Sequence, residues 1–167
     1  DQIIDLLEHK TDVAIRFGDL NDSSLHARLL CKSRLYIVAS PEYLATHGYP
    51  ATPQDILNHT QIGFSKVSRL NTWPIRVNGE RLTVKPKIKA SSGETVRQLC
   101  LRGHGIARLS EFEILKDIKQ GRLIALFEDQ IELYEQHIHA VYYQQEHLPK
   151  RVRLFIEFLT QKLSKFR

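Results

Sequence analysis

Cysteine, tryptophan and methionine are scarce in this chain, and long apolar runs are missing. The 167 residues include two cysteines, one tryptophan and no methionine. Cys31 and Cys100 are too few and too widely separated for a disulfide framework, so we expect two buried thiols. No run approaches the roughly 20 apolar residues of a membrane span. The N-terminal DQIIDLLEHK also lacks the layout of a signal peptide, so the sequence predicts a cytoplasmic protein.

The sequence patterns that accompany catalysis are also missing. There is no G-x-S-x-G, no P-loop and no G-x-G-x-x-G. Ser23 and Ser24 precede His26, but no third group is in evidence to orient the histidine as a base. His137 and His139 share a face of an expected strand, yet no further Cys, Asp or His lies nearby at ligand spacing. We therefore expect no catalytic residue, no metal site and no cofactor.

Basic residues exceed acidic ones, and the formal charge is +5. They are scattered, with local clusters at Arg81, Lys85, Lys87 and Lys89 and near the C-terminus. Nucleic-acid binding would require a basic face together with a reading element. No helix-turn-helix, zinc-finger spacing or stacking motif is present, so these clusters are interpreted as solvated faces.

Short apolar strands alternate with well-marked helix starts along the chain. Ser40 precedes a proline that suits a first helical turn, and Asn78-Gly79 predicts a hairpin over residues 75–82. The segments Ser91–Glu94 and Ser110–Glu113 both have the spacing of a capping box. The alternation favours an open α/β sheet. Expected strands cover residues 13–17, 25–39 with a break near 32–33, 61–64, 83–90, 106–109, 123–127 and 138–143. Expected helices cover residues 3–9 and follow Ser40, Thr52, Ser91, Ser110 and Pro149.

The stretch from Thr11 to Pro50 is the most informative part of the sequence. It reads TDVAIRFGDLNDSSLHARLLCKSRLYIVASPEYLATHGYP. Residues 11–57 match, nearly position for position, the pattern DxAIRxGxLxDSSLxARxL … ASPxYLxxHGxPxxPxDL. In this pattern the chain resembles the effector-binding domain of LysR-type transcriptional regulators. The resemblance points to a sensor of small molecules and away from an enzyme.

The resemblance implies an α/β fold of two Rossmann-like subdomains, in the periplasmic-binding-protein type II architecture. On that template residues 1–36 and 140–167 form a discontinuous first subdomain, and residues 37–139 form the second. The chain opens at Asp1 and not at methionine, and it contains no counterpart of the family's helix-turn-helix. We therefore expect a fragment whose first subdomain is incomplete and whose parent contacts DNA only through the absent part.

The same resemblance implies the partners of the chain. They are a small, anionic effector bound between the subdomains and a second copy in a homodimer or larger homo-oligomer, with no membrane. Three alternatives remain open at this point: a free-standing two-lobed solute-binding protein, an α/β enzyme, and a protein–protein module with a vestigial cleft.

The first candidate binding segment is the loop Ser91, Ser92, Gly93 and Glu94. It follows an expected strand and begins a helix, where unpaired N–H groups and the helix dipole attract anions. Gly93 would allow a ligand to approach the backbone. The resemblance adds that the family lines its cleft with the equivalent loop. The alternative is ordinary helix capping.

The second candidate is Arg16-Phe17-Gly18, where Arg16 could pair with an effector carboxylate as a planar fork. The alternative is a structural pair between Arg16 and Asp12 or Asp19. A third candidate is Phe64, an aromatic that could form an apolar wall of a ligand pocket. Phe64 and Trp73 could equally be core residues.

Ile106 and Arg108 complete the candidates, through a match to the family's GxGIAxLP. Here Ser110 replaces the usual proline, and Arg108 fills a commonly apolar position. Arg108 would then either contact an acidic effector or face solvent.

Overall fold

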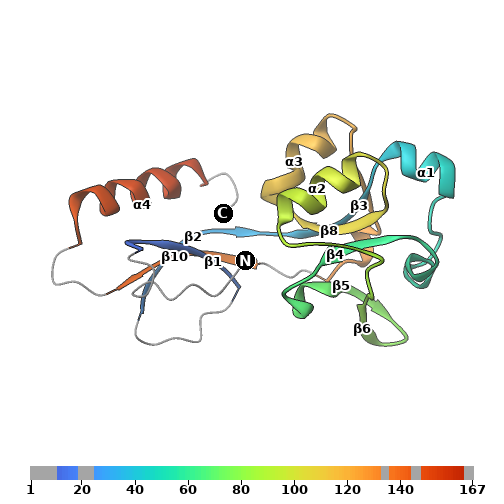
Figure 1. Ribbon diagram of the computed structural model, residues 1–167, viewed down its shortest axis with the longest axis horizontal. Coiled ribbons are helices and arrows are strands. Elements are labelled where there is room, and N and C mark those ends of the chain that lie inside the picture. Colours follow the sequence, from blue (N-terminus) through green and yellow to red (C-terminus); the bar gives the residue numbers. More distant parts are fainter. Residues whose placement is uncertain (1–10, 19–24, 133–135, 144–147, 164–167) are drawn as a thin grey trace. The chain divides into compact units, whose positions relative to one another are not determined.

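The structure is a computed structural model that describes residues 11–18, 25–132, 136–143 and 148–163. The described residues form two compact units (Figure 1). Unit 1 lies within residues 34–134, and unit 2 lies within residues 2–33 and 135–167. The division into functional subdomains at 36/37 and 139/140 stays a prediction. The expected helix at 3–9 lies outside the described residues.

Unit 1 is built on a five-stranded sheet in the order β7-β4-β8-β3-β9. Its strands are β3 (Leu35–Ala39), β4 (Gln61–Phe64), β7 (Ile88–Ala90), β8 (Ile106–Ser110) and β9 (Ile124–Leu126). Strand β4 pairs in parallel with β7 and β8, and β3 pairs antiparallel with β8 and β9. The carboxyl ends of β7, β4 and β8 therefore meet at one edge, the edge at which open α/β sheets bind ligands.

Each face of this sheet has its own apolar core. Helices α2 (Gly93–Leu101) and α3 (Glu111–Lys119) lie on one face, and the hairpin of β5 (Thr72–Val77) and β6 (Glu80–Thr83) lies on the other (Figure 1). Val96, Cys100 and Ile114 from the helices join one buried cluster. Trp73 and Ile75 from the hairpin join the other. That second cluster also holds residues of α1 (Pro41–His47) and the 3-10 helix η1 (Pro53–Asn58), while η2 (Ser68–Asn71) and η3 (Glu128–Gln130) are short connecting turns.

Local sequence signals account for most of these boundaries. Ser40 caps α1 by accepting a hydrogen bond from the Tyr43 N–H at 3.2 Å, with proline in the first turn as predicted. The predicted hairpin is confirmed, because Asn78 and Gly79 take positive φ angles of 52° and 85°. The capping box of Ser110 and Glu113 is confirmed as well.

The predicted capping box at Ser91–Glu94 is wrong. The N-cap is Ser92, whose hydroxyl accepts a hydrogen bond from the Thr95 N–H at 3.2 Å. The Glu94 carboxylate instead accepts hydrogen bonds from Arg97 and Gln98. Either of two adjacent serines can cap a helix. Here Glu94 pairs with residues three and four positions further along the helix, so it does not complete a capping box with Ser91.

Unit 2 is a three-stranded antiparallel sheet in the order β1-β10-β2, with one helix. The strands are β1 (Ala14–Phe17), β2 (Leu25–Ser33) and β10 (Gln136–Tyr143), and the helix is α4 (Lys150–Lys162), which packs on β2. The break between β2 and β3 falls at Arg34, next to the predicted position. None of the described helices is long and apolar enough to cross a membrane.

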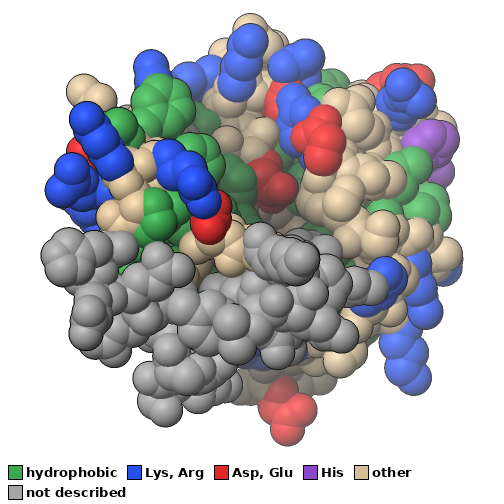
Figure 2. Space-filling view, turned by 60° about the vertical axis from the view of Figure 1, so that its left-hand side comes forward, with side chains coloured by type: hydrophobic (Ala, Val, Ile, Leu, Met, Phe, Trp, Pro, Cys, Tyr) green, Lys and Arg blue, Asp and Glu red, His purple; other side chains and the backbone are tan. Residues whose placement is uncertain are grey.

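The sequence places Val152, Phe155, Ile156, Leu159 and Leu163 on one apolar stripe of α4, and this predicted stripe is only partly buried. Val152 and Ile156 are buried as predicted, but Phe155 is 47% exposed. Leu154 and Phe158 are also exposed, at 51% and 52%. Figure 2 shows apolar and basic side chains side by side on this face of the molecule. The i, i+3, i+4 rule predicted the direction of the stripe but not its width, because the three-stranded sheet covers only a narrow strip of the helix.

Candidate functional site

The carboxyl ends of β4, β7 and β8 bring together three serines from distant parts of unit 1. Phe64 and Ala90 are register partners at the ends of β4 and β7. Directly after them, the Ser65 N–H donates a hydrogen bond to the Ala90 carbonyl at 3.0 Å, and the Ser65 hydroxyl donates to the same oxygen at 3.3 Å. Ser91 therefore leaves the sheet beside Ser65, and β8 ends on the same edge at Ser110. Ser65 and Ser91 are exposed at this edge, whereas Ser110 is buried and caps α3.

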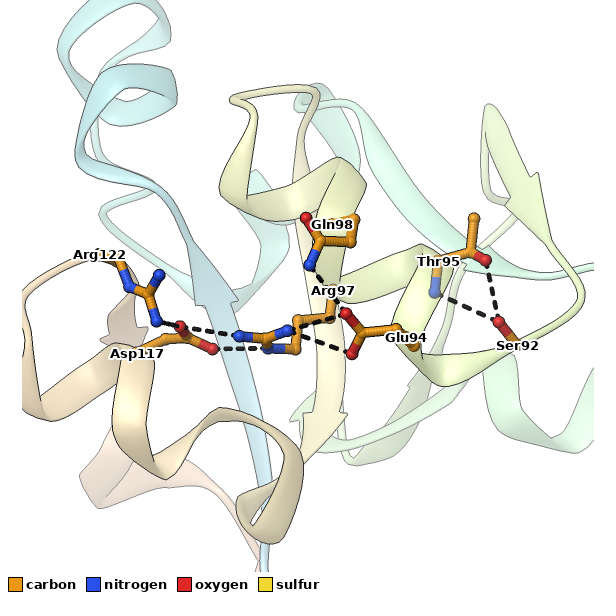
Figure 3. Close-up of polar contacts among 7 residues, drawn as sticks. All are labelled: Ser92, Glu94, Thr95, Arg97, Gln98, Asp117 and Arg122. Atoms are coloured by element: carbon orange, nitrogen blue, oxygen red, sulfur yellow. Dashed lines mark hydrogen bonds and ion pairs between the residues drawn. The ribbon is translucent and has the colours of Figure 1, made fainter.

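The N-terminus of α2 rises from this edge. Ser92 has an extended backbone, with φ of −133° and ψ of 152°, which directs its side chain back to the first helical turn. Its hydroxyl also lies 2.9 Å from the Thr95 hydroxyl (Figure 3). The remaining first-turn N–H groups carry the partial positive charge of the helix dipole. This geometry suits a carboxylate or a similar small acceptor.

Gly93 leaves room for an acidic side chain under the helix start. A Cβ on Gly93 would collide with the Glu113 carboxylate, which approaches from the first turn of α3. Glu113 accepts a hydrogen bond from the Ser110 N–H at 3.3 Å. Burial, and next the charge of Glu94, raise the pKa of Glu113 above its ordinary value. The rise reflects the cost of burying a charged carboxylate in this place.

Arg97 links the start of α2 to α3 (Figure 3). It donates two hydrogen bonds to Asp117, at 2.6 and 3.0 Å, and two to Glu94, at 2.9 and 3.1 Å. Asp117 has no exposed surface and also pairs with Arg122. The Gln98 side chain is the first cause, and Arg97 a further one, of a Glu94 pKa below its usual range. The acidic side chain next to Ser92 is therefore charged and already paired.

The other predicted site residues of unit 1 are Phe64, Ile106 and Arg108, and they lie in three different environments. Phe64 is 8% exposed and joins the core cluster under α2, as Trp73 joins the opposite core. Ile106 is buried at the start of β8, paired with Gln61, and so lies at the end of that strand remote from Ser110. Arg108 is 8% exposed, which excludes the alternative in which it faces solvent. Its charge lowers the pKa of Glu113, against the dominant effect of burial.

Arg16, Phe17 and Gly18 belong to unit 2 and end strand β1. Phe17 is 38% exposed and Arg16 is half-buried, while Gly18 has a φ of 88° and donates its N–H to the His137 carbonyl at 2.8 Å. The alternative partner Asp12 pairs with Arg151. Asp19 lies outside the described residues.

The described residues include His137, His139 and two cysteines, side chains suited to metal binding or nucleophilic attack. No three His, Cys, Asp or Glu side chains in that described part of the chain come together as a metal site. The rings of His137 and His139 lie 6.0 Å apart, as a pair on one strand. Both thiols are buried, as predicted, and neither forms a disulfide. Burial raises the pKa of Cys100 to about 12, so it is a poor nucleophile.

Sequence reasoning missed Arg97, Glu113 as a neighbour of Gly93, and Asp117. One signal was available, because Glu94 and Arg97 are three residues apart on a helix and can pair. Arg97 and Asp117 lie on two different helices, 20 residues apart in the sequence, so no local spacing predicts their contact.

Comparisons with known proteins agree with this geometry. The family described as the LysR substrate binding domain matches residues 1–164. The chain belongs to the LysR substrate-binding domain family. It is 43% identical over 162 residues to the transcriptional regulator CrgA of Neisseria meningitidis, covering 96% of this chain and 54% of that protein. It is 35% identical over 167 residues to the regulator PtxR of Pseudomonas aeruginosa, covering 99% and 53%. The chain thus spans about half the length of these curated relatives.

The fold matches solved regulatory domains of this family. The CrgA regulatory domain from Neisseria meningitidis superposes with a TM-score of 0.91 at 41% identity, covering 98% of this chain and 80% of that one. The full-length Vibrio cholerae virulence activator AphB gives a TM-score of 0.76 at 28% identity, covering 97% and 55%. The predicted recognition and the periplasmic-binding-protein-like α/β fold are both confirmed.

Proposed function

We propose that this chain is the ligand-sensing domain of a cytoplasmic transcriptional regulator and that it binds a small carboxylate without changing it chemically. The observation that carries the proposal is the start of α2, where Ser91 and Ser92 leave the carboxyl edge of a parallel sheet. A helix N-terminus at that edge is a site where backbone N–H groups and hydroxyls can hold an acid.

The charges around this helix start are compatible with an anionic ligand. Glu94 is paired with Arg97, so its charge is already compensated within the first turns of α2. Arg108 is the cation of unit 1 that we propose for the ligand, because guanidinium groups bind carboxylates through two parallel hydrogen bonds. The role predicted for Arg16 in unit 2 stays a prediction. Phe64 would support the site from the core, and Ile106 would act only through β8.

The ligand would act by shifting a population and not by chemistry. If it binds one arrangement of the regulator more tightly than another, that arrangement becomes more populated. In a homodimer or a larger homo-oligomer the shift would reach the segment that contacts DNA. The described residues assemble no metal site, and burial raises the pKa of the Cys100 thiol to about 12, which supports a sensor more than an enzyme.

A thermal-shift screen of the purified chain against small carboxylates, amino acids, aromatic acids and sugars tests this proposal. A ligand at about 100 times its Kd adds roughly 2.7 kcal/mol to the stability of the folded state, so the melting temperature must rise. We expect a concentration-dependent rise with one class of acid and none with the matched neutral amides.

A pair of serine variants separates ligand binding from helix capping. Ser40 and Ser92 cap their helices with the same 3.2 Å bond, so Ser40→Ala and Ser92→Ala both remove a cap worth about 1 kcal/mol. We expect the ligand-induced shift to survive in Ser40→Ala and to disappear in Ser92→Ala and Arg16→Ala. Equal shifts in all variants, or no shift with any acid, would contradict the proposed site.

A further inference from the structure

A group of basic side chains lies on unit 1 beside the proposed ligand site. Lys85, Lys87 and Lys89 are exposed, and the residues between and beside them are buried or half-buried. Only Lys89 lies in a strand, β7, and Lys87 lies at a bend just before it. The three lysines thus lie along the segment that leads into the edge strand β7, and we call them the lysine row.

A second basic segment lies alongside this row. Lys66 and Arg69 are exposed on the loop between β4 and β5. One end of that loop is fixed to the end of the lysine row, because the Ser65 N–H donates to the Ala90 carbonyl at 3.0 Å. The other end is fixed to the start of the row, because the Val84 N–H donates to the Asn71 carbonyl at 2.9 Å. We call these five side chains, Lys66, Arg69, Lys85, Lys87 and Lys89, the basic surface.

The backbone that carries the lysine row is held firmly. The Lys87 N–H donates to the Gln61 carbonyl at 3.1 Å. Pro86 packs onto Gly63 so closely that a Cβ there would lie 2.7 Å from the proline Cγ. The cations are thus presented from an ordered backbone, which reduces the entropy lost when an extended anion binds.

The charge of the basic surface is not balanced by nearby acids. The sequence has no Asp or Glu in residues 56–79 or 81–93. Arg76 and Arg81, on the neighbouring hairpin, both pair with Glu132 at 2.6 Å. Within the described ranges, no carboxylate forms such a pair with the five members of the basic surface. Edge lysines also prevent strands from pairing with other chains, but that role concerns Lys89 on β7 and not Lys66 or Arg69 on a loop.

We propose that the basic surface binds the phosphate backbone of double-stranded DNA without reading its sequence. Lysine is a mobile point charge that contacts phosphates and carries little base information. The relatives are transcriptional regulators, so DNA is the polyanion that we propose as the partner of these cations, which no nearby carboxylate pairs with. This goes beyond the proposed sensing function, in which the chain itself makes no DNA contact, and it revises our interpretation of these residues as a merely solvated face.

The test is the salt dependence of DNA binding by this chain. Fluorescence anisotropy with two unrelated duplexes should give weak, equal affinities that fall steeply between about 50 and 200 mM salt. The triple variant Lys85→Gln, Lys87→Gln, Lys89→Gln should lower the log–log salt slope by about 2.7, at about 0.9 for each lost phosphate contact. The triple variant to arginine should keep the slope, which guards against a folding defect.

A matched triple variant controls for net charge. Lys116, Lys119 and Lys150 are exposed on α3 and α4, outside the basic surface. Their joint change to glutamine removes the same charge and should leave the slope within error of the parent chain. Equal losses in the two glutamine variants, no DNA binding at low salt, or capture of an acidic protein without DNA binding would each overturn the proposal. The ligand-induced thermal shift is read separately, so the two proposals can fail independently.

Discussion

Arg97 concentrates the polar interactions of unit 1 in a single side chain. It bridges Glu94 at the start of α2 and the fully buried Asp117 of α3. A buried carboxylate that loses one of its cations costs far more than an exposed one, because water cannot replace the lost partner. The side chain therefore fixes the helix that carries Ser92 against its neighbour.

We expect Arg97→Ala to lower the free energy of unfolding by about 3 kcal/mol, in the range typical of a broken buried ion pair. Urea denaturation measures this loss. Arg76→Ala is the matched control, because Glu132, like Asp117, is contacted by two arginines, but Arg76 is 59% exposed. Its loss should stay under about 1 kcal/mol. Similar losses in the two variants would show that burial of Asp117 does not matter.

Glu113 and Asp55 predict opposite dependences of stability on pH, although both are the third residue of a capping box. Burial raises the pKa of Glu113, so the folded chain binds more protons there than the unfolded chain does, and stability falls as the pH rises from about 4.5. The backbone N–H of Thr52 lowers the pKa of Asp55, so its contribution is present at neutral pH and is lost as the pH falls below about 3.8.

Thermal melts at a series of pH values test the two predicted directions in which stability changes with pH. Glu113→Gln should melt above the parent chain at pH values over 4.5, and this difference should shrink in more acidic buffer. Asp55→Asn should melt below the parent at neutral pH and converge with it in acid. If Glu113→Gln melted below the parent throughout, the carboxylate would be a net stabilising group and the argument from burial would fail.

Helix starts and turns were the features of this structure that the sequence predicted best. The Ser40-Pro41 start, the Asn78-Gly79 turn and the Ser110–Glu113 box each depend on backbone geometry within four residues. The start of α2 was predicted one residue early because Ser91 and Ser92 are chemically equivalent caps. Arg97 and Asp117 escaped prediction because their contact depends on how two helices pack.

At the scale of elements, the helix α4 divides its apolar residues between core and surface. Val152 and Ile156 face the sheet of unit 2, whereas Phe155 and Phe158 remain about half exposed. A Lys162 ammonium lies 5.6 Å from the centre of the Phe158 ring, so part of this exposed face is covered by its own helix.

Ile156→Ala should destabilise the chain by about 3 kcal/mol, the usual cost of truncating a large buried aliphatic side chain. Phe155→Ala removes a larger side chain from the same helix but should cost well under half as much, because it leaves little cavity. Chemical denaturation of the two variants gives the comparison. The reverse order would mean that Phe155, and not Ile156, anchors α4.

The strand order was harder to predict than the elements themselves. Alternation of strands and helices indicated an open α/β sheet, and the resemblance implied two subdomains. The predicted strand at 106–109 already placed Ile106 and Ser110 at opposite ends of β8. Neither signal showed that β8 pairs in parallel with β4, which puts Ser110 and not Ile106 at the same edge as Ser65. Likewise, the role of Phe64 as a core residue follows from the register of β4 with β7, which pattern alone does not give.

At the scale of the whole molecule, the family match and the regulatory-domain fold point to sensing as the task of this chain. The proposed ligand site depends on the start of α2 in unit 1. The proposed DNA contact depends on the basic surface, which adjoins that site because Lys66 follows Ser65 and Lys89 precedes Ala90. The two proposals depend on different side chains, so each can be tested without the other.

The most direct test of the sensing account is an NMR titration of the isotopically labelled chain with the small carboxylates. The account predicts that the amide resonances of Ser91–Glu94 and of Arg16 shift together and saturate at one ligand concentration, while the acid itself remains chemically unchanged. If these amides do not move with any acid, or if the acid is converted during the titration, the chain is not the sensor proposed here.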